Sequence, residues 1–182
     1  MEEIEVPLEQ AQEHIHHAAH ESGHDGKDTW IGKVALISAL VAVVAAIAAL
    51  LAGHHSNEAM ITQIKASDSW SFYQAKGVKA SILQTKIQII SELGKPTSTK
   101  DEEKLNDYKK EQDEISEKAK EFEHESEHHL KIHETMARSV TLFQVAIAIS
   151  AITVLTRRKK FLFVSLGFSL IGLVIFIQAL LQ

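Results

Sequence analysis

The chain has 182 residues, a formal net charge of −5 and no cysteine. The lack of thiols excludes disulfides and thiolate metal sites. The negative charge argues against nucleic-acid binding, which normally leaves a basic stripe on a protein.

Residues 1–29 form an acidic, histidine-rich tail. The tail carries eight acidic residues, and Lys27 is its one basic residue apart from histidines. A short helix beginning near Pro7 would place His16, His20 and His24 on one face.

Three apolar runs follow, at residues 30–53, 139–156 and 161–182. The second and third runs contain no Asp, Glu, Lys or Arg, and Lys33 in the first run lies close enough to its start to reach the membrane interface. A helix needs roughly 20 apolar residues to cross the hydrocarbon core of a bilayer. We therefore predict three transmembrane helices.

Four consecutive cations, Arg157, Arg158, Lys159 and Lys160, separate the second and third runs. We interpret residues 157–160 as a basic turn, which the positive-inside rule assigns to the cytoplasm. The N-terminal tail is then cytoplasmic, while residues 54–138 and the C-terminus lie on the other side. The segment 54–138 is too long for its own lysines to oppose this orientation.

Residues 54–138 are predicted to form two long helices joined at a tip near residues 94–99. Gly94, followed by Lys95-Pro96, is typical of a helix C-terminus. Thr99 and Glu102 have the spacing of a capping box at the start of the next helix. The two helices would form an antiparallel hairpin.

The second arm of this hairpin carries a seam with alternating spacings of four and three residues, which is typical of a coiled coil. The predicted fold is an all-α membrane protein with three transmembrane helices and a long antiparallel coiled-coil hairpin between the first two. The hairpin would place His54 opposite Arg138, and His133 opposite Ala59. The seam consists of Tyr108, Gln112, Ile115, Ala119, Phe122, Ser126, His129, His133, Met136, Val140 and Phe143.

The first arm has aromatic residues on several sides, namely Trp70, Phe72 and Tyr73. A single antiparallel partner covers one side of a helix, so we expect this arm to meet neighbouring subunits. The alternative is a monomer with a few exposed aromatic side chains. In the first span, small residues at four-residue spacing allow close helix approach in lipid. One set is Ser38, Ala42 and Ala46, which we expect to contribute to an interface between subunits, and a second set is Ala45, Ala49 and Gly53.

Eleven histidines suggest metal binding or pH sensing as an alternative function. The most promising group comprises His54, His55, Glu58 and His133, which the predicted hairpin gathers at the outer membrane surface. His129, four residues before His133 on the same helix, is a further candidate metal ligand. An interfacial hydrogen-bond belt would explain the same residues. A metal site needs three or four converging ligands, and no established metal-binding signature is present. No cofactor is expected, although a divalent transition metal is a possible ligand.

No motif indicates catalysis, because the chain lacks a glycine-rich phosphate loop and a nucleophile elbow. Several stretches of the sequence together are characteristic of one family: Gly53-His54-His55-Ser56-Asn57-Glu58-Ala59, Ile64-Lys65-Ala66-Ser67-Asp68, Tyr73-Gln74-Ala75-Lys76, Gly94-Lys95-Pro96, Thr141-Leu142-Phe143-Gln144 and Leu155-Thr156-Arg157-Arg158. In these stretches the chain resembles bacterial membrane proteins of the domain-of-unknown-function family 4337. This resemblance implies a bacterial inner-membrane protein and carries no activity and no functional residues.

The leading hypothesis is a non-enzymatic inner-membrane protein that forms homo-oligomers and presents the hairpin in the periplasm as a scaffold or as a surface for an unidentified protein partner. The second hypothesis is a histidine-based metal-binding or pH-responsive sensor. A third and weaker hypothesis is an oligomeric pore. The expected surroundings are a lipid bilayer and further copies of the chain, with no nucleic acid.

Overall fold

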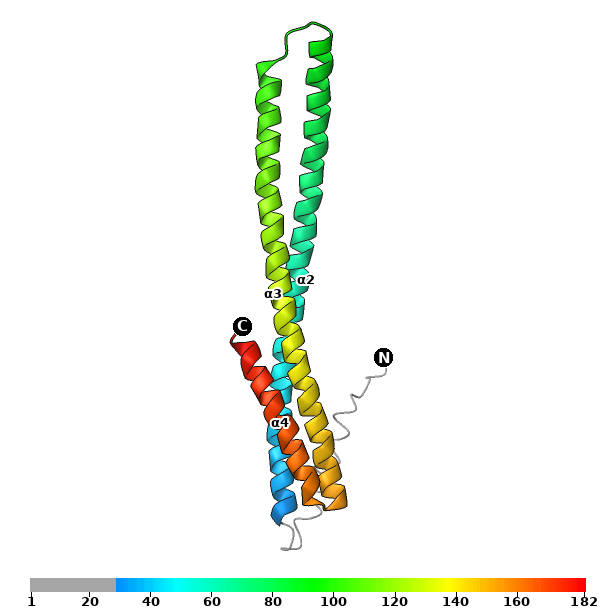
Figure 1. Cartoon of the computed structure of the whole chain (residues 1–182), viewed down its shortest axis with the longest axis vertical. Helices are drawn as coiled ribbons and strands as arrows, with labels where there is room; N and C mark the ends of the chain where they lie inside the picture. The colour runs from blue at the N-terminus through cyan, green and yellow to red at the C-terminus, as the bar shows by residue number, and fades with distance from the viewer. Residues whose placement is uncertain (1–28) are drawn as a thin grey trace. The chain divides into compact units, whose positions relative to one another are not determined.

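The computed structural model describes residues 29–182, and these residues form three helices (Figure 1). Helix α2 spans Thr29–Glu92, α3 spans Thr99–Thr156 and α4 spans Lys159–Leu180. Each helix contains a stretch long and apolar enough to cross a membrane. The prediction of an all-helical chain with three helices of this kind is confirmed for the described residues. The predicted short helix near Pro7 lies outside them.

The described residues divide into two compact units. The first unit comprises residues 29–55 and Lys131–Gln182, and therefore contains parts of all three helices. The second unit, Ser56–Leu130, contains only α2 and α3.

The first unit is built around Phe143 of α3, whose side chain is 2% exposed. It packs against Ala45 and Ala48 of α2 and against Phe176 of α4. Small residues on α2 leave room for the ring, and α4 approaches it closely at Gly172. A Cβ added at Gly172 would lie 3.0 Å from the Phe143 ring. Phe143 therefore touches all three helices, which explains why a residue without a side chain stands opposite it.

Buried serines lie among the apolar residues inside the first unit, and large apolar side chains also cover its outside. Ser150 and Ser165 are buried and lie 2.7 Å apart through their hydroxyl oxygens, and Ser165 also donates to the Ala146 carbonyl at 2.8 Å. Hydroxyls that bond across helices in this way are typical of helix packing in lipid. On the outside, the exposed residues include Leu36, Leu40, Val43, Ile47, Leu50, Leu155, Phe163, Leu170, Ile171, Val174 and Ile177.

The second unit is an antiparallel pair of helices with a narrow interface. Its fully buried residues are small: Ala59, Thr62, Ala66, Ala80, Ala119 and Ser126. Ser126 of α3 donates to the carbonyl of Ala59 on α2 at 2.8 Å, and Lys76 of α2 forms an ion pair with Glu111 of α3. The pair is therefore held by close approach and polar contacts, because no large apolar side chain is fully buried in it.

The buried face of α2 repeats at alternating spacings of three and four residues. In the second unit the sheltered positions are Ala59, Thr62, Ala66, Ser69, Tyr73, Lys76, Ala80, Leu83, Ile87 and Ile90. In the first unit they are Ile31, Val34, Ser38, Val41, Ala45, Ala48 and Ala52. Every member of the seam predicted on α3, from Tyr108 to Phe143, is likewise buried or half-buried.

The turn after α2 has the predicted glycine cap. Gly94 has a φ of 70°, a left-handed conformation that other residues adopt less readily. Its N–H donates to the Ser91 carbonyl at 2.9 Å, and the Lys95 N–H donates to the Ile90 carbonyl at 3.2 Å. These two bonds define a Schellman motif, which satisfies carbonyls at the end of the helix.

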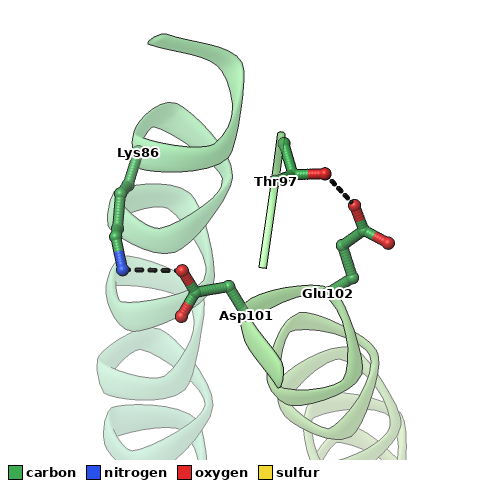
Figure 2. A network of polar contacts seen from close by, with 4 residues as sticks. All are labelled: Lys86, Thr97, Asp101 and Glu102. Atoms are coloured by element: carbon green, nitrogen blue, oxygen red, sulfur yellow. Dashed lines mark hydrogen bonds and ion pairs between the residues drawn. The ribbon is translucent and has the colours of Figure 1, made fainter. Parts of the chain in front are cut away.

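At the start of α3, residues one or two positions before Thr99 make the contacts that were predicted for a capping box of Thr99 and Glu102. Ser98 precedes the helix, and its carbonyl accepts from the N–H of Asp101 at 2.9 Å and of Glu102 at 3.2 Å. The Glu102 carboxylate accepts from the hydroxyl of Thr97 at 2.6 Å rather than reaching back to Thr99 (Figure 2). Thr97 and Ser98, which precede α3, thus form hydrogen bonds with its first turn.

The predicted register of the two arms is wrong by about two helical turns. Ala59 bonds Ser126 instead of lying opposite His133, and His133 bonds the carbonyl of Ala52 at 2.8 Å. Near the tip, Lys86 pairs with Asp101 at 2.6 Å (Figure 2). The prediction assumed a symmetric tip, whereas α2 continues beyond the start of α3 and the connecting loop runs back along it (Figure 1).

Replacing Phe143 with Ala should lower the free energy of unfolding by about 3 kcal/mol, because it empties the centre of the first unit. Phe163 is the matched control, since its side chain is 73% exposed. Phe163→Ala should change the same quantity by less than about 0.5 kcal/mol. Denaturation in mixed micelles, followed by circular dichroism, measures both. Equal losses from the two substitutions would contradict the assigned core.

Candidate functional site

The aromatic cluster of α2 lies largely within the helix pair of the second unit. Trp70 donates through Nε1 to the Glu123 carboxylate at 2.8 Å, and its ring meets Tyr73 edge-on with centroids 5.5 Å apart. Both side chains are half-buried, whereas Phe72 is 53% exposed. Of the three aromatic residues predicted to meet neighbouring subunits, Phe72 presents the most surface.

Lys76 holds this cluster to α3. Its ammonium lies 5.5 Å from the centroid of Phe72 and 5.2 Å from that of Tyr108, and it forms an ion pair with Glu111. An ammonium held over two aromatic faces and paired with a carboxylate restricts the rotation of both helices. The cluster therefore has an architectural role within one chain.

The small residues predicted to mediate subunit contacts in the first unit differ in burial. Ser38 is buried, Ala42 is half-buried and Ala46 is exposed. The helix contacts inside the unit use Ala45, Ala48 and Ala52, at spacings of three and four residues. Ala46 is thus the member of the predicted set that stays available to a second chain.

The histidines and acidic residues predicted as a metal site belong to both units. His54, His55 and His133 lie in the first unit, and Glu58 and His129 lie in the second. The rings of His54 and His55 are 5.6 Å apart, and those of His128 and His129 are 6.0 Å apart. Within residues 29–182, no three His, Asp or Glu side chains form a group that could hold a metal ion. Metal binding stays a prediction.

His133 has a defined structural contact in the first unit. Its Nδ1 lies 2.8 Å from the Ala52 carbonyl of α2. Because a carbonyl oxygen only accepts, Nδ1 carries the hydrogen, which leaves Nε2 to accept in the neutral ring. The contact lies beside a cluster formed by Ala52, Ile132, Met136 and Ala179. His133 therefore helps to join α2 and α3.

The four cations predicted as a basic turn are exposed and lie at the junction of α3 and α4. Arg157 has a φ of 54° and Arg158 precedes α4, while Lys159 and Lys160 are in its first turn. The Lys159 ammonium lies 5.9 Å from the centroid of the Trp30 ring. We call Arg157–Lys160 the basic end of the first unit.

The first arm was expected to meet neighbouring subunits, but the stripe that its exposed aliphatic residues form was not identified from the sequence. Ile61, Ile64, Val78, Ile82 and Ile89 of α2 are between 45% and 66% exposed. Each of them lies two residues after one of the sheltered positions of α2, so they follow the same alternating spacing of three and four residues. A step of two residues is about 200° around a helix, so this outer stripe faces away from α3. The same spacing rule that located the seam on α3 would have found it.

Loss of the His133 contact should weaken the first unit. His133→Ala should reduce the free energy of unfolding by about 1 kcal/mol, because the Ala52 carbonyl loses a donor. His133→Asn places an amide N–H near the position of Nδ1 and should recover most of that loss. Denaturation in mixed micelles compares the three proteins. Equal destabilisation by Ala and Asn would show that the hydrogen bond is not what stabilises the pair.

Comparison with known proteins identifies a family without supplying an activity. No curated protein and no solved structure matches the chain. The sequence model of one family matches residues 30–182, from the start of the first apolar helix to the last residue. The match covers nearly all of the described residues, so the chain belongs to the family described as Domain of unknown function (DUF4337).

Proposed function

We propose that this protein is a non-enzymatic component of the bacterial inner membrane, which self-associates and presents the second unit as a helical scaffold or partner-binding surface. The first unit would be the membrane anchor. The second unit would be a coiled-coil hairpin in the periplasm. The observation that carries the proposal is the distribution of apolar side chains over the two units.

The outside of the first unit supports insertion into lipid. Leu40 and Leu170 are 60% and 63% exposed, and exposed apolar residues of this size recur along all three helices. Its interior contains Ser38, Ser139 and Ser150 beside apolar residues such as Phe143 and Met136. A water-soluble bundle would also cover residues such as Leu40 and Leu170, because burying large apolar side chains stabilises it by about 1.5–3 kcal/mol each. With lipid outside, hydroxyls paired between helices and apolar side chains facing outward are the favourable arrangement.

Self-association is supported by the second unit, which has little core of its own. Its fully buried residues are alanines, one threonine and one serine. In contrast, Val78 and Ile82 on the outer stripe are 60% and 66% exposed. In a second unit surrounded by water, an apolar stripe at coiled-coil spacing is most simply buried by another helix with the same stripe. A second copy of this chain supplies such a helix.

The orientation follows from charge. The basic end has four cations in succession, which favours a cytoplasmic position for the junction of α3 and α4. The second unit, between the first two spans, is then periplasmic and the C-terminus is also on that side. The charged residues of the second unit suit an aqueous compartment, where ion pairs such as Lys86 with Asp101 are solvated.

Charges placed on the outer stripe should separate the subunits. Val78→Glu with Ile82→Glu puts carboxylates where two stripes would meet, so the particle mass should fall to that of one chain in lipid nanodiscs. Light scattering or mass photometry measures this mass. The control is Gln74→Glu with Gln84→Glu, which adds the same charge at exposed positions beside the stripe and should leave the oligomer intact.

A wild-type chain that is strictly monomeric in nanodiscs would refute self-association. An oligomer that survives both pairs of substitutions would refute the outer stripe as its interface while leaving the anchor unaffected. The circular dichroism spectrum should be unchanged in both variants, because these side chains do not contribute to the contact between α2 and α3.

A further inference from the structure

The positive charges of the basic end do not stabilise the ends of the helices around it. Lys159 and Lys160 lie in the first turn of α4, where the positive end of the helix dipole disfavours cations. Arg157 adopts a left-handed conformation, which is unfavourable for a residue other than glycine. Arg158 makes no side-chain cap to α4. Local helix stability therefore does not account for these four residues.

Among the described residues of the first unit, acidic side chains do not compensate this charge. Among residues 29–55 and 131–182, the sequence contains one acidic side chain, Glu134. Glu134 lies 3.6 Å from Arg138 and pairs with it. Its neighbours in sequence, Ile132 and Met136, pack against Ala179 near the C-terminal end of α4, whereas the basic end lies at the N-terminal end of that helix. The ion pairs formed within residues 29–182 do not include Arg158, Lys159 or Lys160.

The indole ring of Trp30 lies beside the basic end. Trp30 lies at the start of α2 and packs beside the cluster of Ile31, Val34 and Val154, to which Leu162 of α4 also contributes. The Lys159 ammonium is 5.9 Å from the Trp30 ring centroid. Tryptophan concentrates at the level of lipid headgroups, with its ring toward the hydrocarbon. The exposed cation Lys33 lies one turn farther along α2.

We infer that the basic end is a binding site for the phosphate groups of anionic phospholipids. This inference rests on the membrane insertion proposed above and adds a ligand to it. Arg158, Lys159 and Lys160 would contact the headgroup phosphates, and Trp30 would pack against the adjoining glycerol and acyl region. Clusters of cations beside a membrane helix attract anionic lipids strongly, because each cation near the surface adds attraction and the site is close to low-dielectric material.

Fluorescence quenching of Trp30 by brominated lipid tests the site. Trp30 and Trp70 are the two tryptophans of the chain, so Trp70→Phe in every sample leaves Trp30 as the sole reporter. The protein is reconstituted in vesicles of equal parts phosphatidylglycerol and phosphatidylcholine. The brominated chains are carried by phosphatidylglycerol in one sample and by phosphatidylcholine in the other. Both leaflets contain both lipids, so the orientation of the protein does not affect the comparison.

The site predicts stronger quenching by brominated phosphatidylglycerol, with an exchange constant of about fivefold in its favour. Arg158→Gln, Lys159→Gln and Lys160→Gln together should abolish this preference. Lys100→Gln, Lys109→Gln and Lys120→Gln remove the same charge from exposed positions of the second unit and should preserve it. Equal quenching by the two lipids in the chain that carries Trp70→Phe alone would overturn the site, although it would still place Trp30 in the bilayer.

Two other results would also overturn the inference. If neither brominated lipid quenches Trp30, membrane insertion of the first unit is itself wrong. If inorganic phosphate removes the preference more effectively than sodium chloride of equal ionic strength, the site belongs to a soluble phosphate compound rather than to lipid.

Discussion

The structure depends on the unequal distribution of large and small side chains over the surfaces of its helices. In the first unit, small and hydroxyl-bearing residues lie inside beside Phe143, Met136 and Ile147, and many Leu, Ile, Val and Phe side chains are exposed on the outside. Buried alanines and Gly172 allow these helices to pack closely. This arrangement is stable where the surroundings are as apolar as the side chains, and that condition leads to the proposed membrane anchor.

The second unit applies the same close packing with a different outer surface. Ala59, Ala66, Ala80 and Ala119 let α2 and α3 approach, and polar contacts such as Trp70 with Glu123 fix their register. The most completely buried residues of this interface are small, so it buries little apolar area for the length of the two helices and stabilises them weakly. The outer stripe offers a second apolar face on the opposite side of α2. Self-association would thus complete a core that one chain leaves unfinished.

Much of the fold could be predicted from the sequence because its repeats are long and uninterrupted. The apolar runs gave the three helices, the spacing from Tyr108 to Phe143 gave the sheltered face of α3, and Gly94 gave the end of α2. The register was not predictable from these signals. It depends on how far α2 continues past the start of α3, which is visible in contacts between the two helices such as Ser126 with Ala59 and Lys86 with Asp101. The sequence also did not predict that Trp70 and Tyr73 face α3. The carboxylate that accepts the hydrogen bond of Trp70 belongs to Glu123, which lies 53 residues farther along the chain.

The candidate sites were predicted less well than the fold, because convergence of side chains depends on the register. His133 was expected near Glu58 in a polar group, and it instead bonds a backbone carbonyl at Ala52. The basic end was predicted from its four consecutive cations. The contact of Lys159 with the Trp30 ring was not predictable, because more than a hundred residues separate the two in sequence.

Membrane insertion of the first unit, with the second unit on the far side from the basic end, is tested most directly by cysteine accessibility. The chain has no cysteine, so single substitutions report without background. In spheroplasts, a membrane-impermeant maleimide should label Lys109→Cys, should label Lys160→Cys only after the membrane is disrupted, and should leave Leu170→Cys unlabelled until the protein is denatured. Labelling of Lys160→Cys in intact spheroplasts would contradict the orientation, and rapid labelling of Leu170→Cys would contradict the membrane anchor itself.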